Sequence, residues 1–450
     1  MTRVLKFGGT SLGDGERVRR VAEIVGAVAE AGEVKPVVVA SAHAGITNLL
    51  LAAAEDALAG VEDPVRPVRE RQFAILDELN LSHDLIGDEL EHLTGILKGI
   101  ALLGERSPRT LDAVASFGER MSTRALAAEL RRLGYKAAAH RAWDLGLITT
   151  RKFGHARPLP EAEGLIRERL QMKLDEGEIP IITGFIGKSE DGVITTLGRN
   201  GSDYSAAIFG AAVGADEIQI WTDVPGILTT DPRVVDGTRV IPALSFAEAS
   251  ELANYGAKVI HPATLTPAVE KSIPIRVKST LEPDAPGSLI VPESDRTEEV
   301  VKAIAHKTGI TLVHIHSTRM LGRPGFLSRI AKVFQIHRID VDMIATSEVS
   351  VSLTVEDSTH LDRAVKRLGT FARVKVVRDR AIVCVVGEGL ADEPGCLARV
   401  FGALAESQTA IDLISQGASR LNLGLVVAAE GVETVVRGLH AALFPSEASA

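Results

Sequence analysis

Short, mostly apolar runs constrain the fold of this chain more than any other feature of its sequence. Loops rich in Gly, Ser or Thr lie where such runs end, and the runs comprise residues 3–7, 36–40, 181–185 and 218–221. Between them, residues 16–30 and 204–213 carry the spacing expected of helices. Apolar strands joined by helices are typical of an α/β fold with a mostly parallel sheet sandwiched by helices. In such sheets, ligands bind beyond the carboxyl ends of the strands.

The last third of the chain contains an internal repeat. Pro324-Gly325 recurs 70 residues later as Pro394-Gly395, and four further positions match at the same offset. Each copy is predicted to contain a strand, a Pro-Gly turn, an amphipathic helix and a second strand. The first strands are placed at residues 311–316 and 381–386. This period exceeds that of solenoid repeats, so it favours two small α+β modules. Two unrelated αβ units are the alternative.

Turn-rich, polar stretches at residues 283–287 and 292–296 indicate a domain boundary. The sequence therefore predicts a large first domain over 1–292, followed by a first region over 293–380 and a second module over 381–450 that contain the two copies of the repeat. This prediction allows the first strand of the first region to pair with the strands of the second module.

Composition narrows the class of protein. The 450 residues are 45% hydrophobic and carry a formal net charge of −9, which disfavours nucleic-acid and membrane-surface binding. No apolar run approaches the ~18 residues of a membrane span, and no signal-type segment opens the chain. Two cysteines cannot form a disulfide framework or a multi-cysteine zinc site, so a cytoplasmic location is expected.

Two loops combine small residues with groups that bind anions. Residues 6–11 (KFGGTS) bring Lys6 next to adjacent glycines, whose N–H groups can approach phosphate oxygens closely. The Walker spacing is absent, and a tight turn with a surface lysine would explain the same residues. Residues 41–48 (SAHAGITN) follow a strand, and Thr47 or Asn48 is expected to cap the next helix, whose N-terminus can hold an anion.

Two later loops carry candidate ligand-binding side chains. Residues 195–203 (TTLGRNGSD) lead into a helix, and Arg199 offers a rigid fork suited to a carboxylate. Residues 221–233 (WTDVPGILTTDPR) offer acceptors, hydroxyls and Arg233, a mixture able to hold a nucleotide, although Pro225-Gly226 alone indicates only a turn.

Two further segments complete this set. Residues 117–122 (FGERMS) supply Glu119, and residues 256–262 (GAKVIHP) supply a second lysine, Lys258. The spacings of a zinc metalloprotease and of an α/β-hydrolase nucleophile elbow are absent, so both classes are excluded.

Taken together, the strings KFGGTS, SAHAGITN, SFGERMS, TTLGRNGSD, WTDVPGILTTDPR and YGAKVIHPATLTPA resemble aspartate kinases in order and spacing. The Pro-Gly repeat resembles the paired ACT modules of that family, and the similarity runs essentially end to end. It is closest to the monofunctional, lysine-inhibited members. The resemblance implies an amino-acid kinase fold and transfer of the ATP γ-phosphoryl group to the β-carboxylate of L-aspartate. That reaction is the first step towards lysine, threonine and methionine.

The resemblance also implies roles for individual residues. Catalysis is expected from Lys6, Arg199, Asp203 and Lys258, with Asp203 orienting Lys6. Aspartate would contact Thr47, Glu119, Arg199, Asn200, Gly201 and Ser202. ATP would contact Lys6, Gly8, Gly9, Thr10, Ser41, Thr222, Asp223, Leu228, Arg233, Lys258 and Val259. Mg²⁺ is expected mainly on phosphate oxygens, so no protein ligand is assigned to it.

The resemblance places an effector, L-lysine, on the ACT modules. Its predicted contacts are Met320, Arg323, Phe326, Leu327, Asp340, Val341, Asp342, Ser347 and Glu348. The acids suit the ammonium groups of lysine, whereas a core of Phe326, Leu327 and Val341 with surface acids is the alternative interpretation. A homodimer through the ACT modules is expected, and pairing of dimers into a tetramer is left open.

The chain departs from the family pattern at a few positions. Asn200 stands where glycine is common, Leu228 replaces a frequent tyrosine, and Arg323 introduces a cation in the effector turn. Rival functions are a kinase for another amino acid such as glutamate, and an inactive amino-acid sensor on a kinase scaffold. A dinucleotide-binding module at Gly387-Glu388-Gly389 is disfavoured because Asp392 occupies the place of the third glycine.

Overall fold

The computed structural model describes residues 1–32, 34–256, 262–293, 300–320, 324–356, 359–390, 392–417 and 419–445. The chain divides into two units. Unit 1 comprises Met1–Ile227 and Ile260–Glu293, and unit 2 comprises Leu228–Val259 and Ser294–Ala450. The grouping of Leu228–Val259 with the C-terminal residues was not anticipated from the sequence, which draws a single boundary at residue 292. Among the described residues, no helix combines the length and apolar character needed to cross a membrane.

The main sheet of unit 1 has the order β3-β5-β2-β1-β8-β10-β11. Its strands are parallel except β11, which runs antiparallel to β10. Their bounds are β1 Thr2–Phe7, β2 Lys35–Ala40, β3 Ala137–His140, β5 Ile179–Thr183, β8 Glu217–Thr222, β10 Ile275–Ser279 and β11 Ser288–Val291. A smaller sheet contains β4 Ile148–Thr149, β6 Ile186–Ser189 and β7 Ile194–Thr196. The predicted parallel sheet is confirmed, with β5 beginning and ending two residues earlier than expected.

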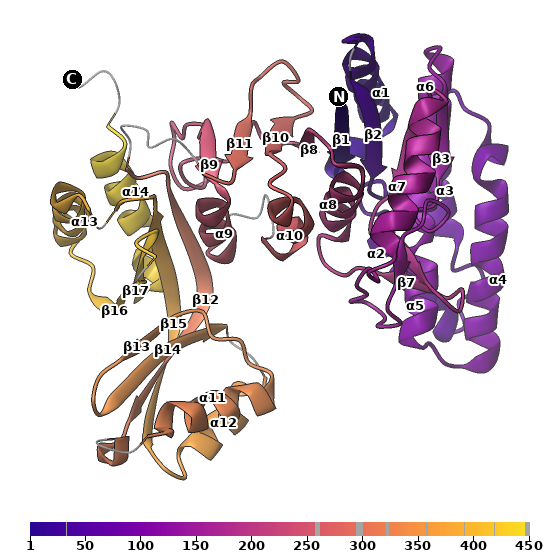
Figure 1. Ribbon diagram of the computed structural model, residues 1–450. Coiled ribbons are helices and arrows are strands. Elements are labelled where there is room, and N and C mark those ends of the chain that lie inside the picture. Colours follow the sequence, from indigo (N-terminus) through magenta and orange to yellow (C-terminus); the bar gives the residue numbers. More distant parts are fainter. Residues whose placement is uncertain are drawn as a thin grey trace. The chain divides into compact units, whose positions relative to one another are not determined.

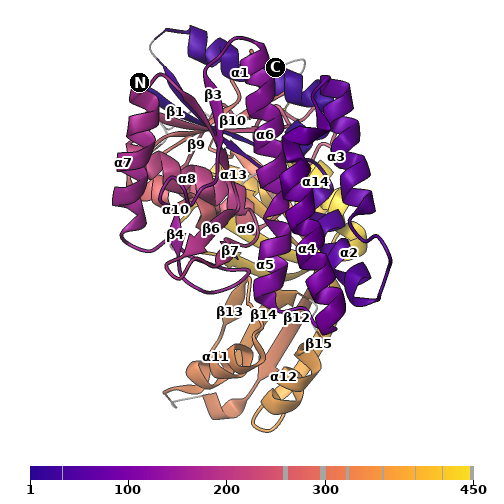
Figure 2. The ribbon, with the colours of Figure 1, turned by 90° about the vertical axis from the view of Figure 1, so that its right-hand side faces the viewer.

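Helices cover both faces of this sheet (Figure 2). Leu5 and Phe7 pack with α1, α2, α3 and α6 in one core, whereas Val4 and Ile218 lie next to Gly210 of α8. This alternation follows from the two-residue period of a strand. The helices are α1 Gly15–Glu30, α2 Ile46–Leu58, α3 Arg66–Leu79, α4 Gly87–Leu103, α5 Pro108–Ala115, α6 Phe117–Arg132, α7 Ala162–Asp175, α8 Gly201–Val213 and α10 Pro262–Glu270, with 3₁₀ turns at Thr10–Leu12 and His83–Ile86.

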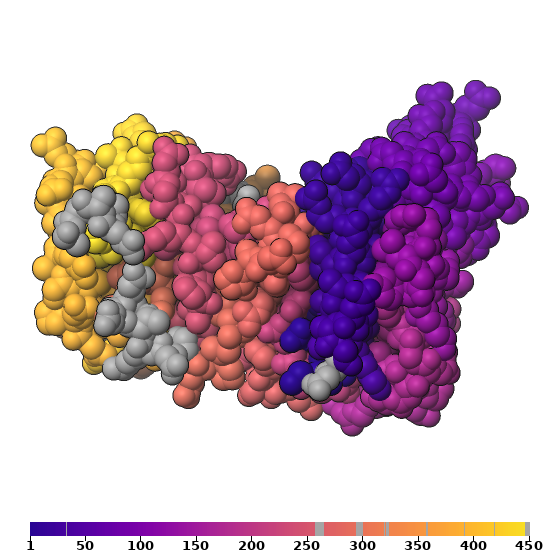
Figure 3. Space-filling model, turned by 90° about the horizontal axis from the view of Figure 1, so that it is seen from above, coloured from indigo at the N-terminus to yellow at the C-terminus, as the bar shows by residue number. Residues whose placement is uncertain are grey.

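Local sequence explains where two of these helices begin. Asp14 precedes α1, and its carboxylate accepts a hydrogen bond from the Arg17 N–H, so the predicted helix over 16–30 begins one residue early. Helix α2 begins at Ile46 after Gly45, whose φ of 81° is left-handed. No side chain caps α2, so the expectation that Thr47 or Asn48 caps this helix is wrong. In the space-filling view, the indigo N-terminal residues lie at the surface beside the violet segments of the same unit (Figure 3).

Unit 2 is built on an antiparallel sheet of order β13-β14-β12-β15-β17-β16 (Figure 1). Its strands are β12 Ala303–His316, β13 Ile344–Thr346, β14 Ser350–Glu356, β15 Arg373–Val386, β16 Ile411–Gln416 and β17 Asn422–Ala428. Its helices are α9 Phe246–Asn254, α11 Phe326–His337, α12 Leu361–Leu368, α13 Pro394–Glu406 and α14 Val432–Leu443, with β9 at Ala243–Ser245 and 3₁₀ turns at Thr318–Met320 and Ala429–Gly431.

The 70-residue repeat corresponds to two α+β modules that share this sheet. Residues 310–316 of β12 pair with β14, whereas Ala303–Lys307 pair with residues 382–386 of β15. Each module has its own core, one beneath α11 and α12 and the other beneath α13 and α14. The second Pro-Gly pair does not form the predicted turn, because Pro394 opens α13, a position where its missing N–H costs no helix hydrogen bond.

Candidate active site

One cleft in unit 1 gathers residues from five separate stretches of the chain. It has a volume of about 350 Å³ and opens at the carboxyl ends of β1, β2 and β5. The sequence-predicted residues that line it are Lys6, Gly9, Ser41, Thr47, Glu119, Arg199, Asn200, Gly201, Ser202 and Asp203. Lys6 and Arg199, which are 193 positions apart, therefore face one cavity.

Lys6 and Asp203 form an ion pair at the base of α8. The Lys6 Nζ lies 2.6 Å from Asp203 Oδ1, and each side chain is 11% exposed. Strand β1 carries Lys6, while Asp203 sits in the first turn of α8, where a carboxylate is favoured by the helix dipole. The pair therefore holds a preoriented ammonium group in the cleft.

Close packing of two glycines brings the loops of the cleft together. A Cβ on Gly9 would lie 3.0 Å from the Ala42 carbonyl oxygen, and one on Gly118 would lie 2.6 Å from the Ala42 Cβ. Gly118 belongs to α6, so its contact with the loop after β2 sets the position of the next residue, Glu119. Larger residues at either position would push these loops apart.

Glu119 is a buried acid with one hydrogen bond. It is 3% exposed, and its Oε1 accepts the Ala42 N–H at 3.1 Å. Its Oε2 has no hydrogen-bond partner among the described residues. Burial raises the pKa of Glu119 to about 8, because the ionised form is poorly solvated there. A cationic partner would therefore stabilise the ionised form of this carboxyl group.

Arg199 differs from the buried Glu119 in its exposure to solvent. Its side chain is exposed at the cleft, and within the described residues it takes part in no ion pair. The neighbouring Asn200 has a φ of 53° and precedes α8. Asparagine tolerates this left-handed conformation better than most residues, which accounts for its presence where the family often has glycine.

The structure adds two supporting residues that sequence reasoning missed. His43 lines the cleft, is 1% exposed, and its Nδ1 lies 2.9 Å from Gln72 Oε1 of α3. Burial lowers the pKa of His43 to about 4, so its imidazole is neutral at pH 7. Asp112 of α5 accepts hydrogen bonds from the Thr196 N–H and hydroxyl at 2.8 and 2.9 Å. It thereby anchors the strand that precedes Arg199.

Only some of the residues predicted to bind the nucleotide are brought together within one unit. Gly8 N–H donates to the Trp221 carbonyl, and the Thr222 hydroxyl donates to Asp223, so these residues lie at the adjoining ends of β1 and β8. Thr10 opens a 3₁₀ turn after the glycines. Leu228 and Arg233 belong to unit 2, whereas Lys258 and Val259 lie outside the described residues.

Arg233 is 83% exposed and pairs with Asp231 at 2.7 Å. This pairing lowers the pKa of Asp231 below its ordinary value. No group of three or more potential metal-ligating side chains occurs within the residues that the structure describes.

The predicted effector residues of unit 2 have varied surroundings. Met320 and Phe326 pack on a core, whereas Leu327 and Val341 are 48% and 40% exposed. Asp340, Ser347 and Glu348 are exposed, and Arg323 lies outside the described residues. Because Leu327 and Val341 are exposed, the alternative in which both are core residues is wrong.

Asp342 is already paired within the chain. Its Oδ1 lies 2.7 Å from the Lys307 Nζ, which is also 2.8 Å from Glu356 Oε1. Burial raises the pKa of Asp342 above its ordinary value despite the lysine. An internal ammonium group therefore occupies this predicted effector contact.

Comparison with known proteins identifies the class of protein that this fold and cleft define. Residues 1–279 match the amino acid kinase family, and residues 313–370 and 383–443 match the ACT domain. The chain is an amino acid kinase with paired ACT modules, as the sequence predicted.

Similar proteins identify the family within this class of kinases. The chain is 39% identical to aspartokinase 3, chloroplastic, of Arabidopsis thaliana over 99% of this chain and 82% of that protein. It resembles the structure of E. coli aspartokinase III in complex with aspartate and ADP, with 39% identity and a TM-score of 0.83 over 99% and 100% of the two chains. The T-state complex of the same enzyme with lysine and aspartate gives 40% identity and a TM-score of 0.79, with 98% and 99% covered. The chain belongs to the aspartokinase family, and the predicted enzyme class, an ATP-dependent aspartate kinase, is confirmed.

Proposed function

We propose that this aspartokinase phosphorylates the β-carboxylate of L-aspartate in the cleft lined by Lys6, Glu119 and Arg199. One observation carries the proposal: three groups share one cavity, namely a guanidinium with no ion pair among the described residues, a buried acid and a preoriented ammonium group. These three groups can bind a carboxylate of aspartate, bind its ammonium group and stabilise the negative charge of the phosphoryl group that is transferred. The aspartate and ADP bound to the E. coli relative support the choice of substrates.

The cleft suggests how aspartate is held. The Arg199 fork binds a carboxylate, and its planar geometry favours two parallel hydrogen bonds. The Glu119 carboxylate binds the ammonium group, which supplies the cation that its buried oxygens lack. Thr47 and Ser202 offer hydroxyl groups, and Asn200 and Gly201 form the rim from which α8 begins.

The chemical step needs positioning more than proton transfer. The β-carboxylate is ionised at pH 7, since its reference pKa is about 3.9, so no general base is required. One of its oxygens attacks the γ-phosphorus of ATP, and the bond from that phosphorus to the ADP oxygen breaks. Lys6, held by Asp203, stabilises negative charge on the transferring group. Mg²⁺, bound with the nucleotide, would neutralise further phosphate charge.

The remaining nucleotide contacts stay predictions. Backbone groups at Gly8, Gly9 and Thr10, the Ser41 hydroxyl and the polar residues Thr222 and Asp223 are proposed to face ATP. Leu228, Arg233, Lys258 and Val259 are proposed to complete its binding.

Trapping of the acyl phosphate tests the substrate assignment. Hydroxylamine converts an acyl phosphate to a hydroxamate, so aspartate with ATP should yield a coloured product, whereas glutamate should yield little. Product from glutamate alone would indicate a kinase for that amino acid. ATP-independent lysine binding without any hydroxamate would indicate an inactive sensor.

We also propose that L-lysine inhibits the enzyme through unit 2, as the T-state complex of the E. coli relative with lysine suggests. Asp342, with Lys307 as its present partner, is the proposed contact for an effector ammonium group. Comparing lysine with threonine as inhibitors tests the identity of the effector. A cytoplasmic homodimer through the ACT modules, or a tetramer of two such dimers, is proposed, and sedimentation equilibrium distinguishes these assemblies.

A further inference from the structure

A second polar cavity lies at the same edge of the sheet in unit 1. It has a volume of about 160 Å³, and it opens where β3 ends at His140 and β5 ends at Thr183. These strands are parallel neighbours, and the carboxyl ends of such strands are where ligands bind. The charged and titratable residues that line the cavity are Glu89, Arg120, Arg124, His140, Arg141 and Asp144.

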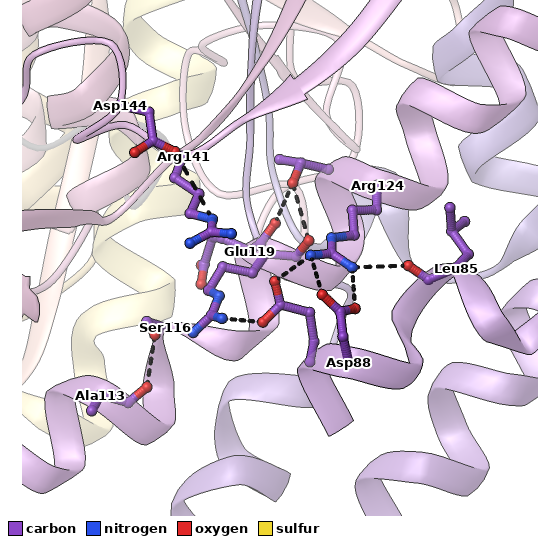
Figure 4. A network of polar contacts seen from close by, with 11 residues as sticks. Leu85, Asp88, Ala113, Ser116, Glu119, Arg124, Arg141 and Asp144 are labelled. Atoms are coloured by element: carbon purple, nitrogen blue, oxygen red, sulfur yellow. Dashed lines mark hydrogen bonds and ion pairs between the residues drawn. The ribbon is translucent and has the colours of Figure 1, made fainter. Parts of the chain in front are cut away.

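One arginine of this cavity, Arg141, has no close acidic partner among the described residues. Arg120 and Arg124 both pair with Glu89, and Arg124 also contacts Asp88. Figure 4 shows Arg141 with Asp144 on one side of this network and Arg124 with Asp88 on the other. The Arg141–Asp144 ion pair is 3.9 Å long between side chains that are 47% and 57% exposed. A pair of that length and exposure compensates little charge.

Arg120 adds an unsatisfied donor. It is 5% exposed, and its Nε has no hydrogen-bond partner among the described residues. Burial lowers the pKa of the Arg120 guanidinium, and the charge of Arg141 acts in the same direction. A buried donor without an acceptor and two neighbouring like charges would both be relieved by an anion.

The geometry points to a binding site for a small oxyanion, a phosphate or a carboxylate group, held between Arg120 and Arg141. Guanidinium groups suit both anions because two of their N–H groups can meet two oxygens. A single water needs only about 10–15 Å³ of such space, so the cavity admits a group of several non-hydrogen atoms. His140 is already paired with Glu178 at 2.5 Å, so it is not required as a ligand.

Ligand-induced thermal stabilisation of the full chain tests this site. Sodium phosphate is titrated against sodium chloride at matched ionic strength, and succinate replaces phosphate in a second series to separate the two anion classes. We expect a rise in Tm that saturates with one anion. Arg141→Gln should weaken the apparent affinity about tenfold or more, because it removes a charged donor pair. Asp144→Asn should strengthen it a few-fold, because it removes a competing carboxylate.

Matched variants separate this site from general charge effects. Arg20→Gln and Glu16→Gln make the same charge changes in the Arg20–Glu16 pair of α1, where the side chains are 38% and 82% exposed. Both should leave the anion response unchanged. The response should also persist in Lys6→Ala, which removes the ammonium of the candidate active site.

Three results would overturn the proposal. These are the absence of stabilisation beyond chloride, equal losses in Arg20→Gln and Arg141→Gln, and a response lost in Lys6→Ala but retained in Arg141→Gln. A crystal soaked in phosphate gives an independent readout that does not depend on the stability of any variant. Density against Arg120 and Arg141 supports the site, whereas density confined to Lys6 or no density contradicts it.

Discussion

The cleft of unit 1 and the predicted effector region of unit 2 differ in whether key charged side chains already have an ionic partner. In the cleft, Arg199 has no ionic partner among the described residues, and Glu119 is buried with one free oxygen. In unit 2, Asp342 is occupied by Lys307 of the same chain. A ligand entering the cleft meets Arg199 and Glu119 without ionic partners among the described residues, whereas a ligand that binds Asp342 must replace an existing ion pair.

This difference bears on affinity and on regulation. A charged side chain without an ionic partner gains the full interaction with an incoming ligand, because no existing ion pair must be broken first. Replacing an internal ammonium with an external one yields only the difference between two similar interactions. Substitutions in the cleft should therefore change the affinity for substrate strongly. Substitutions in the effector region should be able to raise or to lower the affinity for the effector.

The largest effect is expected at Lys6. Lys6→Ala should lower kcat by about 10²–10³-fold, because a preoriented cation acts mainly on the charge of the transition state. The KM for ATP should change much less. Steady-state kinetics of the purified variant measure both quantities, and Lys35→Ala, which removes a 48% exposed lysine paired with Asp175, serves as the control. Equal losses in kcat and in ATP binding would contradict the catalytic role.

Arg199 should come next. Arg199→Lys keeps the charge but loses the fork, so the KM for aspartate should rise about 10–100-fold while the KM for ATP stays near its original value. The control is Arg66→Lys at a 67% exposed position of α3. An unchanged KM for aspartate would remove Arg199 from the aspartate site and weaken the contrast between the two regions.

The pH dependence of aspartate use should reveal Glu119. The pKa of this acid is raised to about 8, so below that pH the free enzyme carries it protonated. An ammonium ion prefers the ionised form, and binding must then release a proton. We expect kcat/KM for aspartate to fall about tenfold for each pH unit below about 8.

Glu119→Gln supplies the test of that assignment. The amide cannot ionise, so the variant should have a lower kcat/KM and a profile that no longer bends near pH 8. A bend that survives in Glu119→Gln would have to belong to another group.

The smallest effect concerns Lys307. Lys307→Ala removes the internal competitor of Asp342, so lysine should inhibit a few-fold more strongly, whereas Asp342→Asn should abolish inhibition. Inhibition curves at fixed substrate measure this, with Lys366→Ala on the exposed face of α12 as the control. Weaker inhibition in Lys307→Ala would mean that Lys307 helps to shape the effector site.

Much of the fold could be predicted because its signals are local. The apolar runs at residues 3–7 and 36–40 correspond to β1 and β2, and the repeat at an offset of 70 corresponds to two modules. What failed was equally local: Gly45, in a left-handed conformation, precedes α2 and no side chain caps this helix, and Pro394 begins a helix instead of a turn.

By itself, the sequence determined the parallel sheet, the paired modules and many of the residues that line the cleft. Strand periodicity and glycine-rich loops act over a few residues and place their side chains at one sheet edge. Only the tertiary structure decided which charges have partners. His43 with Gln72, Asp112 with Thr196, and Lys307 with Asp342 are 29, 84 and 35 positions apart. Burial and pairing between such residues depend on how distant elements pack, and no local pattern encodes that packing.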